Sequence, residues 1–279
     1  MPGAGGISFA CQTYSWQMSG ERYRGRLDHI AAVVADAGFP ALEPEVYMLG
    51  GYRDPQRMLR LLSEHELQLA ALAFACDWWY GVETDRERAD ADEVISFLAA
   101  FPRAKLVLVQ LPGPDRSDLA VRQGHAIACM NAVAHRAIEA GVEPTVHPNS
   151  PPGSLFRISD DYELLLDRLD PDVGFTPDIG HVAAGGMDPL ETLRRYRDRI
   201  DHIHFKDINH DGSWAATGEG RLDFPVIVSY LAGTGYHGWI VFEDESEAAE
   251  RDPDTATRRN AVYARELLSP ILTEASSRS

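Results

Sequence analysis

Two short segments of the sequence end in side chains that bind metals or transfer protons. One segment ends in Asp178 and His181, and the other carries His202, His204 and Lys206. Each begins as an apolar run, as a barrel strand does when it delivers reactive groups to the C-terminal mouth of the barrel. Side chains alternate across a strand, so the last three residues share one face. Two such strand ends, one helix apart, indicate a site for metal or proton chemistry.

Two further predicted strands end in the same kinds of group. His147 and Asn149 follow a run at 142–147, and Glu243 closes an apolar run that begins at residue 238. If the strands form a barrel, four potential ligands come from the ends of four consecutive strands: His147, Asp178, His204 and Glu243. Imidazole and carboxylate without thiolate suit Mn²⁺, Co²⁺, Fe²⁺ or Zn²⁺, and suit Mg²⁺ less well. We expect one divalent ion, with Mn²⁺ favoured.

Substrate contacts are expected from other strand ends. Glu43 or Glu45 faces the mouth if a short strand covers 41–46. Trp78 and Trp79 follow a strand at 67–75, and such a cluster either lines a substrate pocket or covers the barrel core. We select Glu45, Trp79 and Asn149 as candidate substrate-binding residues.

Strand-like and helix-like segments alternate about eight times, which indicates a single (β/α)8 barrel rather than a doubly wound sheet. The predicted strands cover 7–14, 41–46, 67–75, 105–111, 142–147, 173–178, 200–206 and 238–245. The predicted helices cover 26–37, 55–66, 86–101, 117–140, 160–169, 189–196, 224–231 and 254–268. The chain has 279 residues, close to the ~250 that such a barrel needs. We therefore expect one domain over 1–279, with a disordered polar tail at 274–279.

Composition narrows the classes of partner. The chain is 44% hydrophobic and 25% charged, and its formal net charge of −17 argues against nucleic acid, whose phosphates are bound through Lys and Arg. Neither a membrane span nor a signal peptide is predicted, so a cytoplasmic location is expected. The three cysteines are widely spaced, which favours buried thiols over a disulfide framework or a thiolate zinc site.

The second half of the chain resembles the xylose-isomerase-like sugar phosphate isomerase/epimerase superfamily of barrels. Four motifs carry the resemblance: Asp178-Ile-Gly-His181, His202-Ile-His-Phe-Lys-Asp207, Gly218-Glu-Gly220 and Gly235-Tyr-His-Gly-Trp-Ile-Val-Phe-Glu243. The resemblance implies the same four metal ligands, a substrate contact from His181, and a substrate oxygen within reach of Lys206. It also implies a carbohydrate or cyclitol substrate and leaves a homo-oligomer open.

The sequence departs from the superfamily on strand five, where the epimerase branch carries a glutamate and this chain has His147. Glu143 could take that place only if the strand register were shifted. The implied chemistry is removal of a proton next to a carbonyl, with Glu243, His181 or His147 as catalytic base. Return of the proton gives isomerisation or epimerisation, the leading prediction. Loss of a β-hydroxyl gives dehydration, the alternative, which resembles the reaction of inosose dehydratase.

Two other classes fit less well. An endonuclease IV-like repair enzyme would require several zinc ions and a basic face; the number of candidate ligands does not fit the first requirement, and the net charge of −17 does not fit the second. A binding subunit without activity would be recognised by the absence of metal and turnover.

Overall fold

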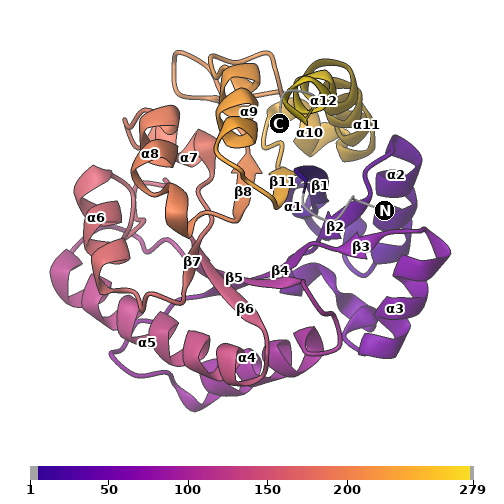
Figure 1. Ribbon diagram of the computed structural model, residues 1–279. Helices are drawn as coiled ribbons and strands as arrows, with labels where there is room; N and C mark the ends of the chain where they lie inside the picture. The colour runs from indigo at the N-terminus through magenta and orange to yellow at the C-terminus, as the bar shows by residue number, and fades with distance from the viewer. Residues whose placement is uncertain (1–5, 277–279) are drawn as a thin grey trace. The chain divides into compact units, whose positions relative to one another are not determined.

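The computed structural model describes residues 6–276, and the chain divides into two compact units. The first unit combines Met1–Ala70 with Asp201–Ser279, and the second comprises Ala71–Ile200. Figure 1 shows parallel strands and helices in both. A single domain over 1–279 stays a prediction. Within residues 6–276, no helix has the length and apolar character that crossing a membrane requires.

The first unit contains a five-stranded parallel sheet in the order β3-β2-β1-β11-β8. Its strands are β1 (Ser8–Gln12), β2 (Ala41–Glu43), β3 (Gln68–Leu69), β8 (His202–Phe205) and β11 (Trp239–Phe242). A small antiparallel pair consists of β9 (Asp207–Ile208) and β10 (Trp214–Ala215). The α-helices are α1 (Tyr14–Met18), α2 (Leu27–Ala37), α3 (Pro55–Glu64), α9 (Phe224–Gly233), α10 (Glu247–Arg251), α11 (Pro253–Tyr263) and α12 (Ser269–Ser276). Short 3-10 turns cover Gly20–Tyr23, Val46–Met48 and Gly50–Tyr52, and a π-helical turn covers Ala264–Leu268.

This sheet is strongly curled. Strands β2 and β8 are separated by β1 and β11, which in a flat sheet would place them about 14 Å apart, at ~4.8 Å per strand. Nevertheless Glu43 on β2 contacts His202 and His204 on β8. Ala10 on β1 and Ala41 on β2 have small side chains and stand two positions before Gln12 and Glu43, respectively. They pack together on the same face of the sheet. The curl therefore brings Glu43 of β2 and the two histidines of β8 together on the concave face of the sheet.

The convex face of the same strands is apolar and aromatic. Phe205 lies next to His204 in the sequence, points to the opposite face, and stacks on Phe224 of α9 with ring centroids 4.8 Å apart. Phe242 packs edge-on against Phe205 at 5.9 Å. All three rings are at most 1% exposed, and removing one typically costs about 3–5 kcal/mol. This packing fixes which face the histidines of β8 occupy.

The second unit contains a four-stranded parallel sheet in the order β4-β5-β6-β7. Its strands are β4 (Ala71–Cys76), β5 (Lys105–Gln110), β6 (Glu143–His147) and β7 (Gly174–Phe175). Its helices are α4 (Asp85–Leu98), α5 (Leu119–Glu139), α6 (Ser159–Arg168), α7 (Ile179–Ala184) and α8 (Pro189–Arg195), with a 3-10 turn at Arg197–Arg199. In Figure 1, α4 and α5 run along one side of β4 to β6. His147 is in register with Val109 of β5, so the two side chains share a face.

Aspartate and proline set the beginnings of four helices. Asp54, Asp188, Asp223 and Asp252 are N-caps that each accept a backbone N–H through the side chain, and a proline follows within the first two helical positions. Such a cap stabilises a helix by about 1 kcal/mol, and proline at the first position sacrifices no intrahelical bond. The sequence thus specifies these boundaries locally.

Three features differ from the sequence prediction. The strand expected at 67–75 is two strands, because Ala70 N still bonds to Leu42 O beside β2 whereas Ala71 pairs with Lys105 of β5. Helix α7 begins directly after Asp178, where no helix was predicted. The tail predicted to be disordered at 274–279 is helical as far as Ser276, because α12 continues from Ser269; positions 277–279 lie outside the described residues.

Candidate metal-binding and catalytic residues

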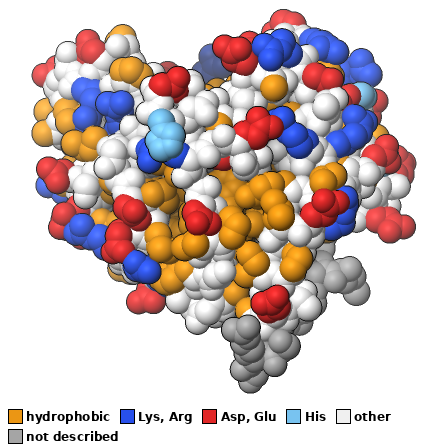
Figure 2. All heavy atoms as spheres, turned by 90° about the horizontal axis from the view of Figure 1, so that it is seen from above, with side chains coloured by type: hydrophobic (Ala, Val, Ile, Leu, Met, Phe, Trp, Pro, Cys, Tyr) orange, Lys and Arg blue, Asp and Glu red, His pale blue; other side chains and the backbone are white. Residues whose placement is uncertain are grey.

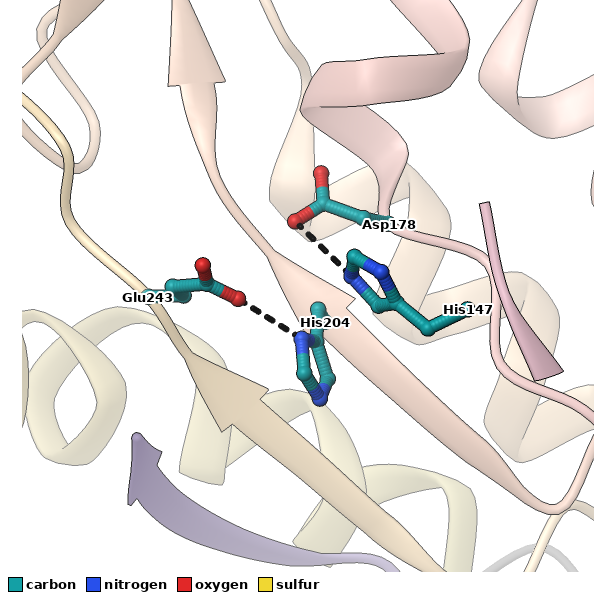
Figure 3. Close-up of side chains that lie close together, drawn as sticks. All are labelled: His147, Asp178, His204 and Glu243. Carbon is teal, nitrogen blue, oxygen red and sulfur yellow. Dashed lines mark hydrogen bonds and ion pairs between the residues drawn. The ribbon is translucent and has the colours of Figure 1, made fainter. Parts of the chain in front are cut away.

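In the first unit, the ends of β8 and β11 bring a histidine and a glutamate together. His204 Nδ1 lies 2.7 Å from Glu243 Oε2 (Figure 3). The two residues are 2% and 5% exposed. Lys206 Nζ lies 3.2 Å from Glu243 Oε1, donates to Glu245, and sits 5.2 Å from the ring centre of Trp214. This strand end therefore combines two potential metal ligands with a buried cationic donor.

Glu43 on β2 completes a buried charge network around His204. Its Oε1 lies 2.9 Å from His204 Nε2, and its Oε2 lies 2.6 Å from His202 Nε2. Burial alone would raise the pKa of Glu43, but the two histidines outweigh it and lower the pKa. Burial likewise opposes protonation of His204, yet Glu43 and Glu243 together raise its pKa. His204 thus lies between two carboxylates that favour its protonated form.

Glu45 lies two residues beyond Glu43 and meets a different set of groups. Gln12 Nε2 donates to Glu45 Oε1 at 2.9 Å, and the backbone N–H of Glu45 donates to Thr13 Oγ1 at 3.0 Å. Burial, followed by repulsion from Glu243, raises the pKa of Glu45 to about 8. The raised pKa favours the protonated carboxyl, which can donate a hydrogen bond.

In the second unit, His147 at the end of β6 and Asp178 before α7 form a similar pair. His147 Nε2 lies 3.8 Å from Asp178 Oδ2 (Figure 3), and both side chains are buried. Asp178 Oδ1 accepts the backbone N–H of His181 at 2.9 Å and so caps α7. Asp178 therefore has two roles, because one oxygen holds the helix while the other faces His147.

His181 is held by its neighbours in α7 and in the loop after β6. Ser150 Oγ lies 2.8 Å from His181 Nδ1, and the ring packs edge-on to that of His147 at 5.8 Å. Asn149 Nδ2 donates to Gln110 O at 2.9 Å and its Oδ1 accepts from Ser154, so this amide fixes the loop. A substrate contact from Asn149 stays a prediction.

Glu143 lies far from the catalytic end of β6. It is the first residue of the strand, its side chain is 70% exposed, and it forms an ion pair with Lys105 at 2.6 Å. The register with β5 pairs Glu143 with Lys105 and His147 with Val109. The register-shifted alternative is therefore wrong, and β6 contributes His147.

Trp78 and Trp79 differ in exposure and therefore in the role each can have. Trp78 is 1% exposed and packs edge-on against Phe74, so it covers the core. Trp79 is 46% exposed and stacks on the Arg122 guanidinium at 4.2 Å. Trp79 thus stays a candidate for substrate contact.

The loop after β9 is tied down by one carboxylate. Asp207 Oδ2 accepts the backbone N–H groups of Gly218 and Gly220 at 3.0 and 2.9 Å, and Oδ1 accepts those of Ile208 and Leu222 at 2.8 and 3.3 Å. A Cβ on Gly220 would lie 2.2 Å from Asp207 Oδ1, which explains the glycine. Backbone amides of the Gly218-Glu-Gly220 motif are therefore used to order this loop.

Sequence reasoning missed several groups that hold the predicted ones. Glu43 was weighed only as an alternative to Glu45, although alternation along β2 places both on one face. Gln12 and Ser150 were not singled out, since neither side chain carries a charge and each contacts a residue at least 31 positions away. Their roles depend on tertiary packing, for which the local pattern holds no signal.

Parallel strands followed by helices, with histidines and carboxylates at strand ends, define the class of barrel enzymes whose chemistry sits at those ends. The chain belongs to the xylose isomerase-like TIM barrel family, whose model matches residues 31–267. The predicted (β/α)8 fold class and superfamily are thereby confirmed.

The curated relatives include dehydratases. The chain is 30% identical over 162 residues to an inosose dehydratase of Geobacillus kaustophilus (strain HTA426), a match that covers 51% of this chain and 52% of that protein. It is 27% identical over 268 residues to the rhizopine catabolism protein MocC of Rhizobium meliloti, covering 82% and 76%. The chain therefore spans about half the length of the inosose dehydratases it matches.

Solved structures share the fold at low sequence identity. The IolI protein with a bound zinc atom superposes with a TM-score of 0.75 at 14% identity, covering 96% of this chain and 99% of that one. The probable 3-DHS dehydratase AsbF of Bacillus anthracis gives 0.73 at 14% identity, covering 93% and 99%. L-ribulose 3-epimerase gives 0.72 at 18% identity, covering 98% and 96%. Both reaction classes predicted from the sequence thus occur among the similar proteins.

Proposed function

We propose that the chain is a divalent-metal-dependent enzyme that removes a proton next to the carbonyl of a sugar or cyclitol. One observation carries this proposal: each unit presents a buried histidine nitrogen beside a carboxylate oxygen at the end of parallel strands. We propose that His147, Asp178, His204 and Glu243 together bind one ion. Mn²⁺ remains our first choice, and the zinc in IolI makes Zn²⁺ its main alternative.

In each histidine–carboxylate pair, small movements would bring the two potential ligand atoms to the separation found around a bound metal ion. Metal–ligand bonds of about 2.1 Å place neighbouring ligand atoms roughly 3.0–3.4 Å apart in octahedral or tetrahedral geometry. The observed separations of 2.7 Å for His204–Glu243 and 3.8 Å for His147–Asp178 lie on either side of that range. When bound, the ion would polarise the substrate carbonyl and stabilise the negative charge of an enediolate.

The protein's own residues supply proton transfer and substrate orientation. We propose Glu243 as the base, with His181 or His147 as the second proton carrier. The hydrogen bond between Ser150 and His181 Nδ1 fixes the orientation of the ring. Nε2 would then be the ring nitrogen that exchanges a proton with the substrate. Lys206 would bind a substrate oxygen, and protonated Glu45 would donate to a second oxygen.

We propose dehydration of a keto-cyclitol or keto-sugar as the outcome, with epimerisation as the second candidate. Elimination needs one base, and one acid that protonates the departing hydroxyl. Glu243 would be the base, and either Glu45 or His181 would be the acid. Epimerisation by carboxylate exchange needs a second carboxylate opposite Glu243, whereas β6 offers His147 and its Glu143 is at the distant end. The inosose dehydratases among the relatives support dehydration as the first candidate, and the structural similarity to L-ribulose 3-epimerase supports epimerisation as the second.

Product analysis in D₂O tests this proposal. The metal-loaded protein would be incubated with a panel of inososes, ketoses and their phosphates, followed by NMR and ultraviolet absorbance. We expect a new enone or diketone chromophore with loss of water, abolished in Glu243→Gln. An epimeric sugar carrying solvent deuterium would favour the second candidate, and no reaction across the panel would favour a binding subunit.

The remaining proposals concern the setting of the enzyme. We infer a cytoplasmic location and a small-molecule substrate without nucleic acid, and we leave open a homo-oligomer. Figure 2 shows side chains of Lys and Arg mixed with those of Asp and Glu and with hydrophobic side chains. The net charge of −17 argues against binding of a phosphate backbone.

A further inference from the structure

Glu43 holds two histidines through its two carboxylate oxygens. His202 Nε2 lies 2.6 Å from Oε2, and His204 Nε2 lies 2.9 Å from Oε1. The side chains of Glu43 and His202 are fully buried, and that of His204 is 2% exposed. A carboxylate so enclosed is retained only with good partners, and here the partners are two ring nitrogens of one strand.

The chemistry of the carboxylate determines the form of both rings. An ionised carboxylate only accepts hydrogen bonds, so each Nε2 that faces Glu43 must carry a hydrogen. With Nε2–H committed to Glu43, His204 presents its other nitrogen, Nδ1, toward Glu243 Oε2 at 2.7 Å. Nδ1 is therefore the nitrogen that can bind a metal beside Glu243.

We propose that Glu43 is a positioning residue that holds His204 with Nε2 protonated and Nδ1 directed at the metal. This inference rests on the proposed metal site and adds a carboxylate that acts through a ligand instead of touching the ion. Carboxylates that accept the second N–H of a metal-binding histidine fix its orientation and raise its basicity. His202 donates a hydrogen bond to the other carboxylate oxygen of Glu43 and holds that side chain in place.

The alternative is an ion held by these three side chains themselves, since potential ligand atoms of Glu43, His202 and His204 all lie within 4.8 Å of one another. The contacts within the cluster favour direct pairing over a shared ion. His202 Nε2 and Glu43 Oε2 form a hydrogen bond of 2.6 Å, and His204 Nε2 forms an ion pair with Glu43 Oε1 at 2.9 Å.

The diagnostic variant is Glu43→Gln. An amide oxygen can accept one of the two N–H groups, but the amide nitrogen would then oppose the other N–H. We expect the zinc affinity measured by calorimetry to fall about 10–100-fold while the stoichiometry stays at one ion per chain. Glu143→Gln is the matched control, because Glu143 is exposed at the first residue of β6, pairs with Lys105, and its replacement should leave zinc affinity unchanged.

Nitrogen-15 NMR of the histidine rings supplies a readout that does not depend on activity. Zinc-loaded wild type should show His204 with a protonated Nε2 and a zinc-shifted Nδ1, and Glu43→Gln should lose this single form. Metal-free wild type should show slowly exchanging Nε2–H signals from both His202 and His204, a measurement that requires no variant to fold.

Three results would overturn the inference. Wild-type zinc affinity in Glu43→Gln would remove the positioning role, and so would missing Nε2–H signals in the metal-free wild type. Two ions in the wild type and one in the variant would make Glu43 a ligand. Wild type that bound no zinc while keeping both Nε2–H signals would contradict the proposed function alone and uphold the hydrogen-bonded arrangement of Glu43.

Discussion

Replacing Asp178 by asparagine or alanine separates its two structural roles. Asp178 Oδ1 caps α7 through the His181 N–H at 2.9 Å, while Oδ2 faces His147 at 3.8 Å. Asparagine is as good an N-cap as aspartate, whereas alanine costs about 1 kcal/mol, within a range of 0.5–2. We expect metal-free Asp178→Asn to match wild type within about 0.5 kcal/mol and Asp178→Ala to lose about 1–2 kcal/mol.

Zinc affinity should depend on the carboxylate charge of Asp178 and not on its capping of α7. Both variants lose the carboxylate ligand. Zinc affinity should therefore fall by more than the ~10–100-fold that is typical when a residue hydrogen-bonded to a ligand is replaced. Urea unfolding of the metal-free proteins and zinc calorimetry measure the two effects separately. The matched control is Asp188→Ala, which removes an N-cap with the same 2.9 Å bond, to Glu191 N–H, from α8. Asp188→Ala should lose similar stability and keep full zinc affinity.

Either half of this reasoning can fail independently. If Asp178→Asn is as unstable as Asp178→Ala, the cap is not the structural role of the side chain. If Asp178→Asn binds zinc as wild type does, Asp178 is not a metal ligand.

Three further predictions concern other parts of the chain. Asp207→Asn should destabilise the protein by about 2–4 kcal/mol and open the loop 208–222 to proteases, because two of four backbone N–H groups lose their acceptor; an uncleaved loop would contradict this. Burial raises the pKa of the Cys11 and Cys76 thiols from 9.0 to about 12, so their stabilisation is present below pH 9 and is lost between pH 9 and 12. Urea midpoints should fall across that window, and dithionitrobenzoate should react slowly at pH 8; a flat profile would refute it. Trp79→Ala should raise KM at nearly unchanged stability, and normal turnover would assign Trp79 no substrate role.

The sequence predicted the elements that carry strong local signals. Gly38 ends α2 with a φ of 99°, as the position after that helix required, and the apolar run at 105–110 is β5. The division of 67–75 into β3 and β4 was missed because the run is apolar throughout, and only hydrogen bonding shows where pairing changes from β2 to β5. Helix α7 was missed because it has only six residues and is followed directly by Gly185-Gly186, which favours a loop.

The site was predictable where chemistry-bearing residues sit on the strands themselves. Alternation placed His202, His204 and Lys206 on one face, and the contacts of all three with glutamates agree. The reach of Glu43 across two intervening strands depends on the curl of the sheet, which has no local signature. Alternation alone also gave no reason to choose between Glu43 and Glu45, although the two residues meet different partners.

The central claim is that His147 and Asp178 share one ion with His204 and Glu243. The most direct test is the metal content of wild type, His147→Ala and His204→Ala after equilibration with Zn²⁺ or Mn²⁺, measured by mass spectrometry together with circular dichroism to verify folding. The account predicts one ion per wild-type chain and none in either folded variant. One ion retained in either variant would contradict it.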